Sequence, residues 1–282
     1  MPLIARAAAR DWNRVDALLE LTLRSVLAQS DGTFELLLAG HDVPPSWNVL
    51  TRGDPRFRFL RADWPVDAPT TANDDGGCKK WMIKEAVREG GGGLMMYLDA
   101  DDLVASYLVE TARRLITPQR VGAVLDRGYV VDFGTLHAVE LPDGRVFDGG
   151  FHRLCGSSTI ARVEPASSDP MRFDPHETLG SHHLWPESAR EAGVDLVRLP
   201  VPGAYFVNTD ENHSELYGPF AEWRRTFNAA VRSMGVPLDG HVAARFGLTR
   251  EILERHSGLA FTDGKSGRQG AAHRPVEPLP SA

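Results

Sequence analysis

The sequence lacks the features that mark secreted and membrane proteins. It has two cysteines in 282 residues, Cys78 and Cys155. Their spacing fits neither a disulfide framework nor a zinc site, so we expect free thiols in a reducing compartment. No apolar run approaches the roughly 20 residues that cross a bilayer, and the N-terminus lacks the apolar core of a signal peptide. We therefore expect no transmembrane segment and a cytoplasmic location, with peripheral contact at the inner membrane surface left open.

The sequence also has fewer basic than acidic residues. The chain has 31 Lys and Arg against 38 Asp and Glu, a net charge of −7. Proteins that bind nucleic acid usually present a basic face, so no nucleic-acid partner is expected. A bound divalent ion can reverse the local field, so nucleotides remain compatible with this charge. Hydrophobic content of 42% and charged content of 24% are those of a globular protein with a sizeable core.

An acidic cluster is the most informative motif present. The apolar run Leu94 to Leu98 predicts a buried strand, and Asp99, Asp101 and Asp102 follow it directly. Crowded carboxylates are costly to bury without compensation, and carboxylate oxygens are the ligands of hard cations. The cluster predicts a Mn²⁺ or Mg²⁺ site. In the alternative reading, Asp102 caps a helix that begins near Leu103.

Periodicity predicts an alternation of helices and strands. The first 120 residues alternate the two, which favours a parallel sheet covered by helices, with ligands beyond the carboxyl ends of its strands. Helices are expected over residues 15–28, 79–89, 103–116, 176–192 (after a loop) and 219–233, strands over 34–40, 57–61, 94–98, 121–133 and 136–147, and a loop over 62–78.

The order of several segments resembles the nucleotide-sugar glycosyltransferases of the GT-A fold. Thr22 to Ser30 resembles the first-helix signature of glycosyltransferase family 2, and Leu98 to Leu103 resembles its metal motif. Within that family the chain is most similar to bacterial rhamnosyltransferase-type sequences, although no residue of this sequence identifies rhamnose as the transferred sugar. The supporting stretches also include Asp11–Trp12, Cys155 to Ser158 and Asn212 to Ser214.

The resemblance implies an α/β fold of GT-A (Rossmann-like) type. A mostly parallel sheet would be flanked by helices, with a smaller mixed C-terminal part. Residues 1–120 would form the nucleotide-sugar-binding half and residues 121–235 the acceptor-binding half of one domain. Residues 236–263 would add a helical extension. The Gly-, Pro- and Ser-rich segment 264–282 is expected to be a disordered tail.

The resemblance also assigns roles around the metal. Asp99 would face the ribose or base of a donor linked to UDP, dTDP or GDP. Asp101 would bind the Mn²⁺ or Mg²⁺ that bridges the diphosphate, and Asp102 would be a second ligand. His213 is the candidate for the late histidine that many GT-A enzymes supply to the same metal. The acceptor would be a saccharide or another hydroxyl compound.

The catalytic base is less clearly marked. The family usually opens a late helix with a Glu-Asp pair, whereas this chain has His182 and His183, with Glu177 nearby. A neutral imidazole can act as a base near pH 7, so these three residues are the catalytic candidates. In the alternative reading, the two histidines cap a helix and the base comes from elsewhere.

Basic residues near the expected donor site complete the assignment. Lys79 and Lys80 lie at the start of the helix predicted over 79–89 and would reach the donor phosphates, unless they form a solvated pair. Arg6 and Asp42 are the candidates for contacts to the donor phosphate or base, although the family's usual segment near Arg6 is absent. Trp81 and Trp185 would line a sugar site or belong to the core.

Three functions fit these residues. The leading one is transfer of a sugar from a nucleoside diphosphate to an acceptor hydroxyl, with inversion. The second is a metal-dependent phosphoesterase, in which the carboxylates and histidines hold ions that activate water. The third is a non-catalytic module that binds sugar nucleotides, suggested by the missing Glu-Asp pair. The order of the motifs favours the first.

Overall fold

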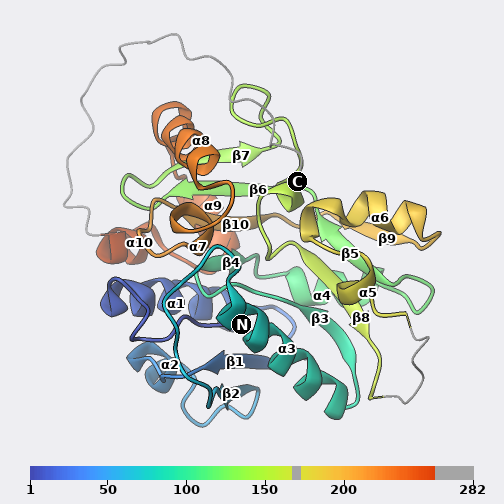
Figure 1. Cartoon of the computed structure of the whole chain (residues 1–282). Coiled ribbons are helices and arrows are strands. Elements are labelled where there is room, and N and C mark those ends of the chain that lie inside the picture. Colours follow the sequence, from blue (N-terminus) through green and yellow to red (C-terminus); the bar gives the residue numbers. More distant parts are fainter. Residues whose placement is uncertain (167–172, 258–282) are drawn as a thin grey trace.

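A computed structural model of the chain describes residues 1–166 and 173–257 and shows an α/β fold (Figure 1). Its α-helices are α1 Trp12–Leu27, α2 Pro45–Leu50, α3 Asp74–Glu89, α4 Leu108–Leu115, α5 Pro175–Thr178, α6 Trp185–Glu191, α7 His213–Leu216, α8 Ala221–Met234, α9 Gly240–Arg245 and α10 Arg250–Ser257. Its strands are β1 Leu36–Gly40, β2 Phe57–Arg61, β3 Gly93–Met96, β4 Asp102–Val104, β5 Gly122–Leu125, β6 Gly128–Asp132, β7 His137–Leu141, β8 Thr159–Val163, β9 Leu196–Leu199, β10 Gly203–Val207 and β11 Val236–Pro237. Two 3-10 turns, η1 Phe151–Arg153 and η2 His182–Leu184, lie between these elements.

The strands form three small sheets. Strands β1 and β2 pair in parallel, and the orders of the other sheets are β11-β7-β6-β10-β4 and β3-β8-β5-β9. Five of the eight strand pairs are antiparallel, so the expectation of a mostly parallel sheet is wrong, although the α/β class is confirmed. The short link between β6 and β7 is one reason, because a tight connection can only join antiparallel strands.

Helix α1 forms where periodicity predicts it. The side chain of Asp11 caps it by accepting hydrogen bonds from the backbone N–H groups of Asn13 and Arg14. The apolar face that includes Leu19 and Leu23 is buried. This face packs against α2 and β4, and thereby positions the acidic turn between β3 and β4.

The segment that follows the acidic cluster differs from the prediction. Residues 103–116 were expected to be one helix, but Asp102–Val104 is strand β4, and α4 starts only at Leu108. Strand β4 pairs antiparallel with β10, with Asp102 opposite Tyr205. Asp102 is therefore not a helix cap. Tertiary pairing overrides the local helical periodicity here.

Two further element boundaries differ from the prediction. The expected strand over 121–133 is two strands, β5 and β6, in different sheets. Helix α3 begins at Asp74, within the expected loop, because the Asn73 side chain caps it by accepting from Gly76 N–H.

Helix α8 covers β6 and β7 (Figure 1). Helices α9 and α10 lie within residues 236–263, and the expected tail 264–282 lies outside the described residues.

A pair of glycines fixes the turn that later supports the site. Gly128 of β6 and Gly203 of β10 are register partners, and a Cβ at either would collide with the ring of Phe151. Phe151 is fully buried against them. Only glycine at these two positions leaves room for the ring, so the contact of Phe151 with the sheet holds η1 in place.

Candidate functional site

One cavity of about 650 Å³ collects most of the residues predicted from sequence. It lies between the N-terminal end of α3, the turn from β3 to β4, the loop after η1, and the loop between β10 and α7. The predicted residues that line it are Lys79, Lys80, Asp99, Asp101, Asp102, His182 and His213. His183, Glu177, Arg6 and Asp42 are not part of its wall.

The turn after β3 presents the three carboxylates in different ways. Asp102 is buried in β4 and accepts a hydrogen bond from the Cys155 thiol at 3.3 Å. The backbone N–H of Asp99 donates to Ser157 Oγ at 2.8 Å, which holds the turn against the loop after η1. Lys80 Nζ lies 3.6 Å from the Asp99 carboxylate. Asp99 thus has a cationic neighbour.

Asp101 and Asp102 differ from Asp99 in their surroundings. Burial raises the pKa of Asp101 to about 7, and the charges of Asp99 and Glu215 add to the effect. Burial and the two other carboxylates raise the pKa of Asp102 well above its usual value. Within the described ranges, 1–166 and 173–257, no Lys, Arg or His forms an ion pair with either side chain. A cation would relieve this repulsion.

The donor set suits a hard cation but does not enclose one. Across the residues that the structure describes, no group of three or more His, Cys, Asp or Glu side chains is arranged to hold a metal ion. Two adjacent carboxylates without a basic partner fit Mn²⁺ or Mg²⁺, which commonly take remaining ligands from water and from substrate phosphates. An ion at Asp101 and Asp102 would need such outside ligands.

His213 lies in the same cavity but makes another contact. It is the first residue of α7, whose cap is the Asn212 side chain. Its Nε2 atom lies 2.7 Å from the carbonyl oxygen of Thr70. A carbonyl only accepts hydrogen bonds, so Nε2 carries the proton in this arrangement. The structure therefore brings His213 to the cavity of Asp101, with its Nε2 engaged elsewhere.

His182 presents a neutral ring to the cavity. Its Nδ1 contacts the carbonyl oxygen of His152, so Nδ1 is protonated and the lone pair lies on Nε2. Burial, the main cause, lowers the pKa of His182 to about 4. His183 instead pairs through Nδ1 with Ser181 Oγ at 2.9 Å, outside the cavity wall. Of the two histidines, the structure places only His182 in the cavity.

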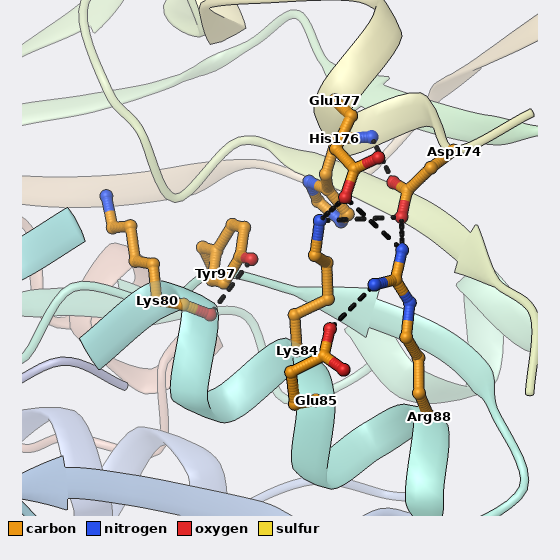
Figure 2. Close-up of polar contacts among 8 residues, drawn as sticks. All are labelled: Lys80, Lys84, Glu85, Arg88, Tyr97, Asp174, His176 and Glu177. Carbon is orange, nitrogen blue, oxygen red and sulfur yellow. Dashed lines mark hydrogen bonds and ion pairs between the residues drawn. The ribbon is translucent and has the colours of Figure 1, made fainter. Parts of the chain in front are cut away.

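Glu177 belongs to a separate ion-pair cluster (Figure 2). Its carboxylate binds Lys84, and Arg88 donates to the buried carboxylate of Asp174. Figure 2 shows Lys84 and Arg88 reaching from α3 toward Asp174 and Glu177 at α5. Nearby, the His176 ring lies 4.7 Å from that of Tyr97. The structure does not bring Glu177 to His182.

The two predicted lysines differ in their surroundings. Lys79 is fully buried, and its ammonium group donates to Leu3 O at 2.7 Å and to Asp75. Burial lowers the pKa of Lys79. Lys79 therefore ties the N-terminal segment to α3, whereas Lys80 lies beside Asp99 with a partly exposed side chain. Lys80 is the better placed of the two to meet a ligand.

Arg6 and Asp42 line a second, neighbouring cavity of about 590 Å³. The backbone N–H of Arg6 donates to the Asp42 carboxylate at 2.9 Å. Trp64 lies on the wall of both cavities, and its indole N–H donates to Asp75 at 3.0 Å. The structure thus brings Arg6 and Asp42 together next to the main cavity.

Sequence reasoning missed several residues of the main cavity. Arg224 and Tyr205 line it, from α8 and β10, and so does Trp64. The amphipathic pattern over 219–233 located the helix of Arg224, but nothing local marks which polar residue faces a cavity. Conversely, Trp185 is core, and Trp81 is 64% exposed and outside the cavity wall.

Comparison with known proteins adds no assignment. No protein-family model matches the chain, and a search of curated proteins finds no match. No helix within residues 1–166 and 173–257 has both the length and the apolar character needed to span a membrane. The functional argument therefore depends on the geometry of the cavity.

Proposed function

We propose that this protein is a metal-dependent glycosyltransferase of GT-A type. It would move a sugar from a nucleoside-diphosphate donor to an acceptor hydroxyl, with inversion at the anomeric carbon. One observation carries the proposal: the carboxylates of Asp101 and Asp102 form no ion pair with a basic residue of the described ranges, and they line a cavity that also contains the neutral ring of His182. A cation site and a proton acceptor in one cavity are the two requirements of this chemistry.

The carboxylate side of the cavity would take the donor. Asp101 and Asp102 would hold Mn²⁺ or Mg²⁺, and His213 would join them once its Nε2 leaves Thr70. When bound, the ion would act as a Lewis acid that offsets charge on the departing nucleoside diphosphate. Lys80 would add a positive charge near the phosphates, and Asp99 would contact the ribose.

The neighbouring cavity would take the base of the donor. Arg6 and Asp42 lie there next to Trp64, which also lines the main cavity. A ligand that spans both spaces would place its base near Asp42 and its phosphates near Asp101. UDP, dTDP and GDP all remain candidate carriers.

His182 would act as the base. Its unprotonated Nε2 would accept the proton of the acceptor hydroxyl while the hydroxyl oxygen bonds to the anomeric carbon and the bond from that carbon to the diphosphate breaks. Burial keeps the ring neutral at pH 7 and ready to accept. The same burial makes it a weak base, so proton transfer would occur late, when the oxygen has already lost electron density.

The phosphoesterase reading is the weaker proposal. It needs several histidines around one or two ions, and His183 does not line the cavity. The hypothesis of a non-catalytic binding module can be distinguished from a glycosyltransferase by experiment, because such a module would bind the donor and transfer no sugar.

Thermal-shift measurements with UDP, dTDP and GDP, with and without Mn²⁺, test the donor site. Ligand that binds only the folded state raises the melting temperature by mass action. We expect one base to give a shift that depends on Mn²⁺. Asp101→Asn should remove that dependence, whereas Asp148→Asn, which changes an exposed carboxylate outside the cavity, should keep it.

Transfer assays on the matching sugar nucleotide test the chemistry. His182→Gln should keep the nucleotide shift and lose on the order of 100-fold or more in transfer, the range for a general base. A shift without transfer on any acceptor would support the binding module. Phosphate-ester cleavage that needs no acceptor would support the phosphoesterase. The absence of any metal-dependent shift would overturn the proposal.

A further inference from the structure

Arg224 is a cation on the wall of the main cavity. Its Nη2 donates to the carbonyl oxygen of Leu154 at 2.9 Å, and its Nη1 lies 3.4 Å from the Tyr205 hydroxyl. Both partners are neutral. In the described part of the chain, Arg224 forms no ion pair. A guanidinium group has five N–H donors, so Arg224 keeps its charge and has donors left for a ligand.

The other basic residues of the cavity wall differ in this respect. Of the lysines and arginines that line the cavity, Lys79 pairs with Asp75 and is fully buried, and Lys80 lies 3.6 Å from Asp99. Arg224 is the third. An anionic group that enters the cavity without a metal ion therefore meets at Arg224 a positive charge that interacts with Glu215 outside the cavity wall but forms no ion pair among the described residues.

One backbone turn orients both Arg224 and His182. The carbonyl of His152 holds the His182 ring, and the carbonyl of Leu154, two residues later, holds the Arg224 guanidinium. The ring of Phe151 fixes the position of this turn, because it packs against Gly128 of β6 and Gly203 of β10. The turn therefore presents a neutral proton acceptor and a cation to the same space.

Arg224 lies near His182, because carbonyl groups of one turn hold both side chains. Its positive charge contributes to lowering the pKa of the His182 ring. It also opposes the rise in the pKa of Glu215, which is not part of the cavity wall. Arg224 thus shares with His182 the part of the cavity assigned to the acceptor.

We propose that Arg224 binds a carboxylate or phosphate group of the acceptor, close to the hydroxyl that His182 would deprotonate. This inference rests on the proposed function, and it narrows the acceptor to anionic alcohols such as uronic acids, hydroxy acids or phosphorylated alcohols. A guanidinium group can bind either anion through two parallel hydrogen bonds, which would also orient the hydroxyl. A neutral saccharide would bring no negative charge to Arg224.

Binding of small anions to the full-length protein tests the inference. Glucuronate and glycerol 3-phosphate are titrated against glucose and glycerol by calorimetry, first without divalent cations, so that chelation does not contribute. We expect at least one anion to bind about tenfold or more tightly than its neutral counterpart, as a charge-assisted contact would give. The two anions separate a carboxylate acceptor from a phosphate acceptor.

Variants of α8 assign the effect to Arg224. Arg224→Gln should remove the preference for the anion, and Arg224→Lys should keep part of it. Arg225→Gln is the matched control, because Arg225 is the next residue of the same helix and is exposed outside the cavity wall. Circular dichroism on each variant shows whether the fold is intact, and Arg224→Lys keeps the test valid if Arg224→Gln does not fold.

The outcomes separate this inference from the proposed function. Equal binding of anion and neutral compound by the wild type would overturn the inference. So would a loss of nucleotide affinity in Arg224→Gln with the anion preference unchanged, because Arg224 would then serve the donor. A preference that depends on Arg224 in a protein that binds no nucleotide would support the anion site and overturn the glycosyltransferase proposal alone.

Discussion

The imidazole of His213 is bonded through Nε2 to the backbone carbonyl of Thr70, at 2.7 Å and across 143 positions of sequence. This contact joins the start of α7 to a segment of the cavity wall that runs from Trp64 to Thr70. The same nitrogen cannot hold this carbonyl and a cation at once. Engagement of His213 Nε2 with a metal would therefore release the segment.

We expect His213→Ala to loosen this segment. Loss of one hydrogen bond worth roughly 1 kcal/mol should speed amide exchange in residues 66–72 about fivefold, measured by hydrogen–deuterium exchange without metal. His137→Ala is the control, since His137 also contacts a backbone carbonyl, that of Arg232, away from the cavity. Unchanged exchange in residues 66–72 would show that the contact does not restrain the segment.

The ion-pair cluster of α3 and α5 should matter for stability. Asp174→Ala would leave the buried side chains of Lys84 and Arg88 short of a carboxylate (Figure 2), at a cost of about 3 kcal/mol in the free energy of unfolding. Urea denaturation measures it. Glu140→Ala removes the exposed pair with Arg127 and should cost less than about 1 kcal/mol. Similar losses for both variants would contradict the distinction.

Two buried histidines should contribute stability that is lost as the pH falls below neutrality, whereas the raised pKa values of Asp101 and Asp102 act in the opposite direction. Burial lowers the pKa of both His176 and His182 from 6.5 to about 4, so the unfolded chain takes up these protons first. Their contribution is intact above pH 6.5 and is lost toward pH 4. At pH 5 the loss is about 2 kcal/mol for each ring.

Denaturation of His182→Gln across this pH range checks the second of these rings. The variant has no titrating group at this position, so its free energy of unfolding relative to that of the wild type should rise by about 2 kcal/mol between pH 7 and pH 5. The contributions of His176 and of the buried carboxylates are common to both proteins and cancel in this difference. An unchanged pH profile would mean that His182 is not buried as the structure has it.

Gly156→Ala should disturb the site and spare the fold. A Cβ at residue 156 would lie 3.2 Å from the Asp99 carboxylate, which is the mobile end of a partly exposed side chain. The carboxylate would shift by a few tenths of an ångström, so we expect an unchanged melting temperature and nucleotide binding weakened several-fold. Gly144→Ala, where a Cβ meets open space, is the control. Normal binding by Gly156→Ala would mean that Asp99 is not at the donor.

Local patterns predicted much of the fold. Helix α1 and strand β2 lie where apolar spacing and alternation placed them, because their buried faces recur within a few residues along the chain. The segment 103–116 was assigned wrongly, because β4 exists only through its pairing with β10. No local pattern contains that partner, which lies about a hundred residues later.

The candidate site divides in the same way. Neighbouring carboxylates after an apolar strand are visible in sequence, and the acidic cluster of Asp99, Asp101 and Asp102 does line the main cavity. Sequence could not separate His182 from His183, nor exclude Glu177 from the cavity, because these residues are close along the chain and differ only in the direction of their side chains.

The sequence by itself determined the chemistry that is available: a run of carboxylates, a pair of histidines and the amphipathic faces that bury the core. Tertiary structure alone decided which of these groups share one cavity, and it added Arg224 from a helix far along the chain. The physical reason is range. Periodicity and charge act between near neighbours, whereas a cavity is made by segments that meet only after the chain has folded.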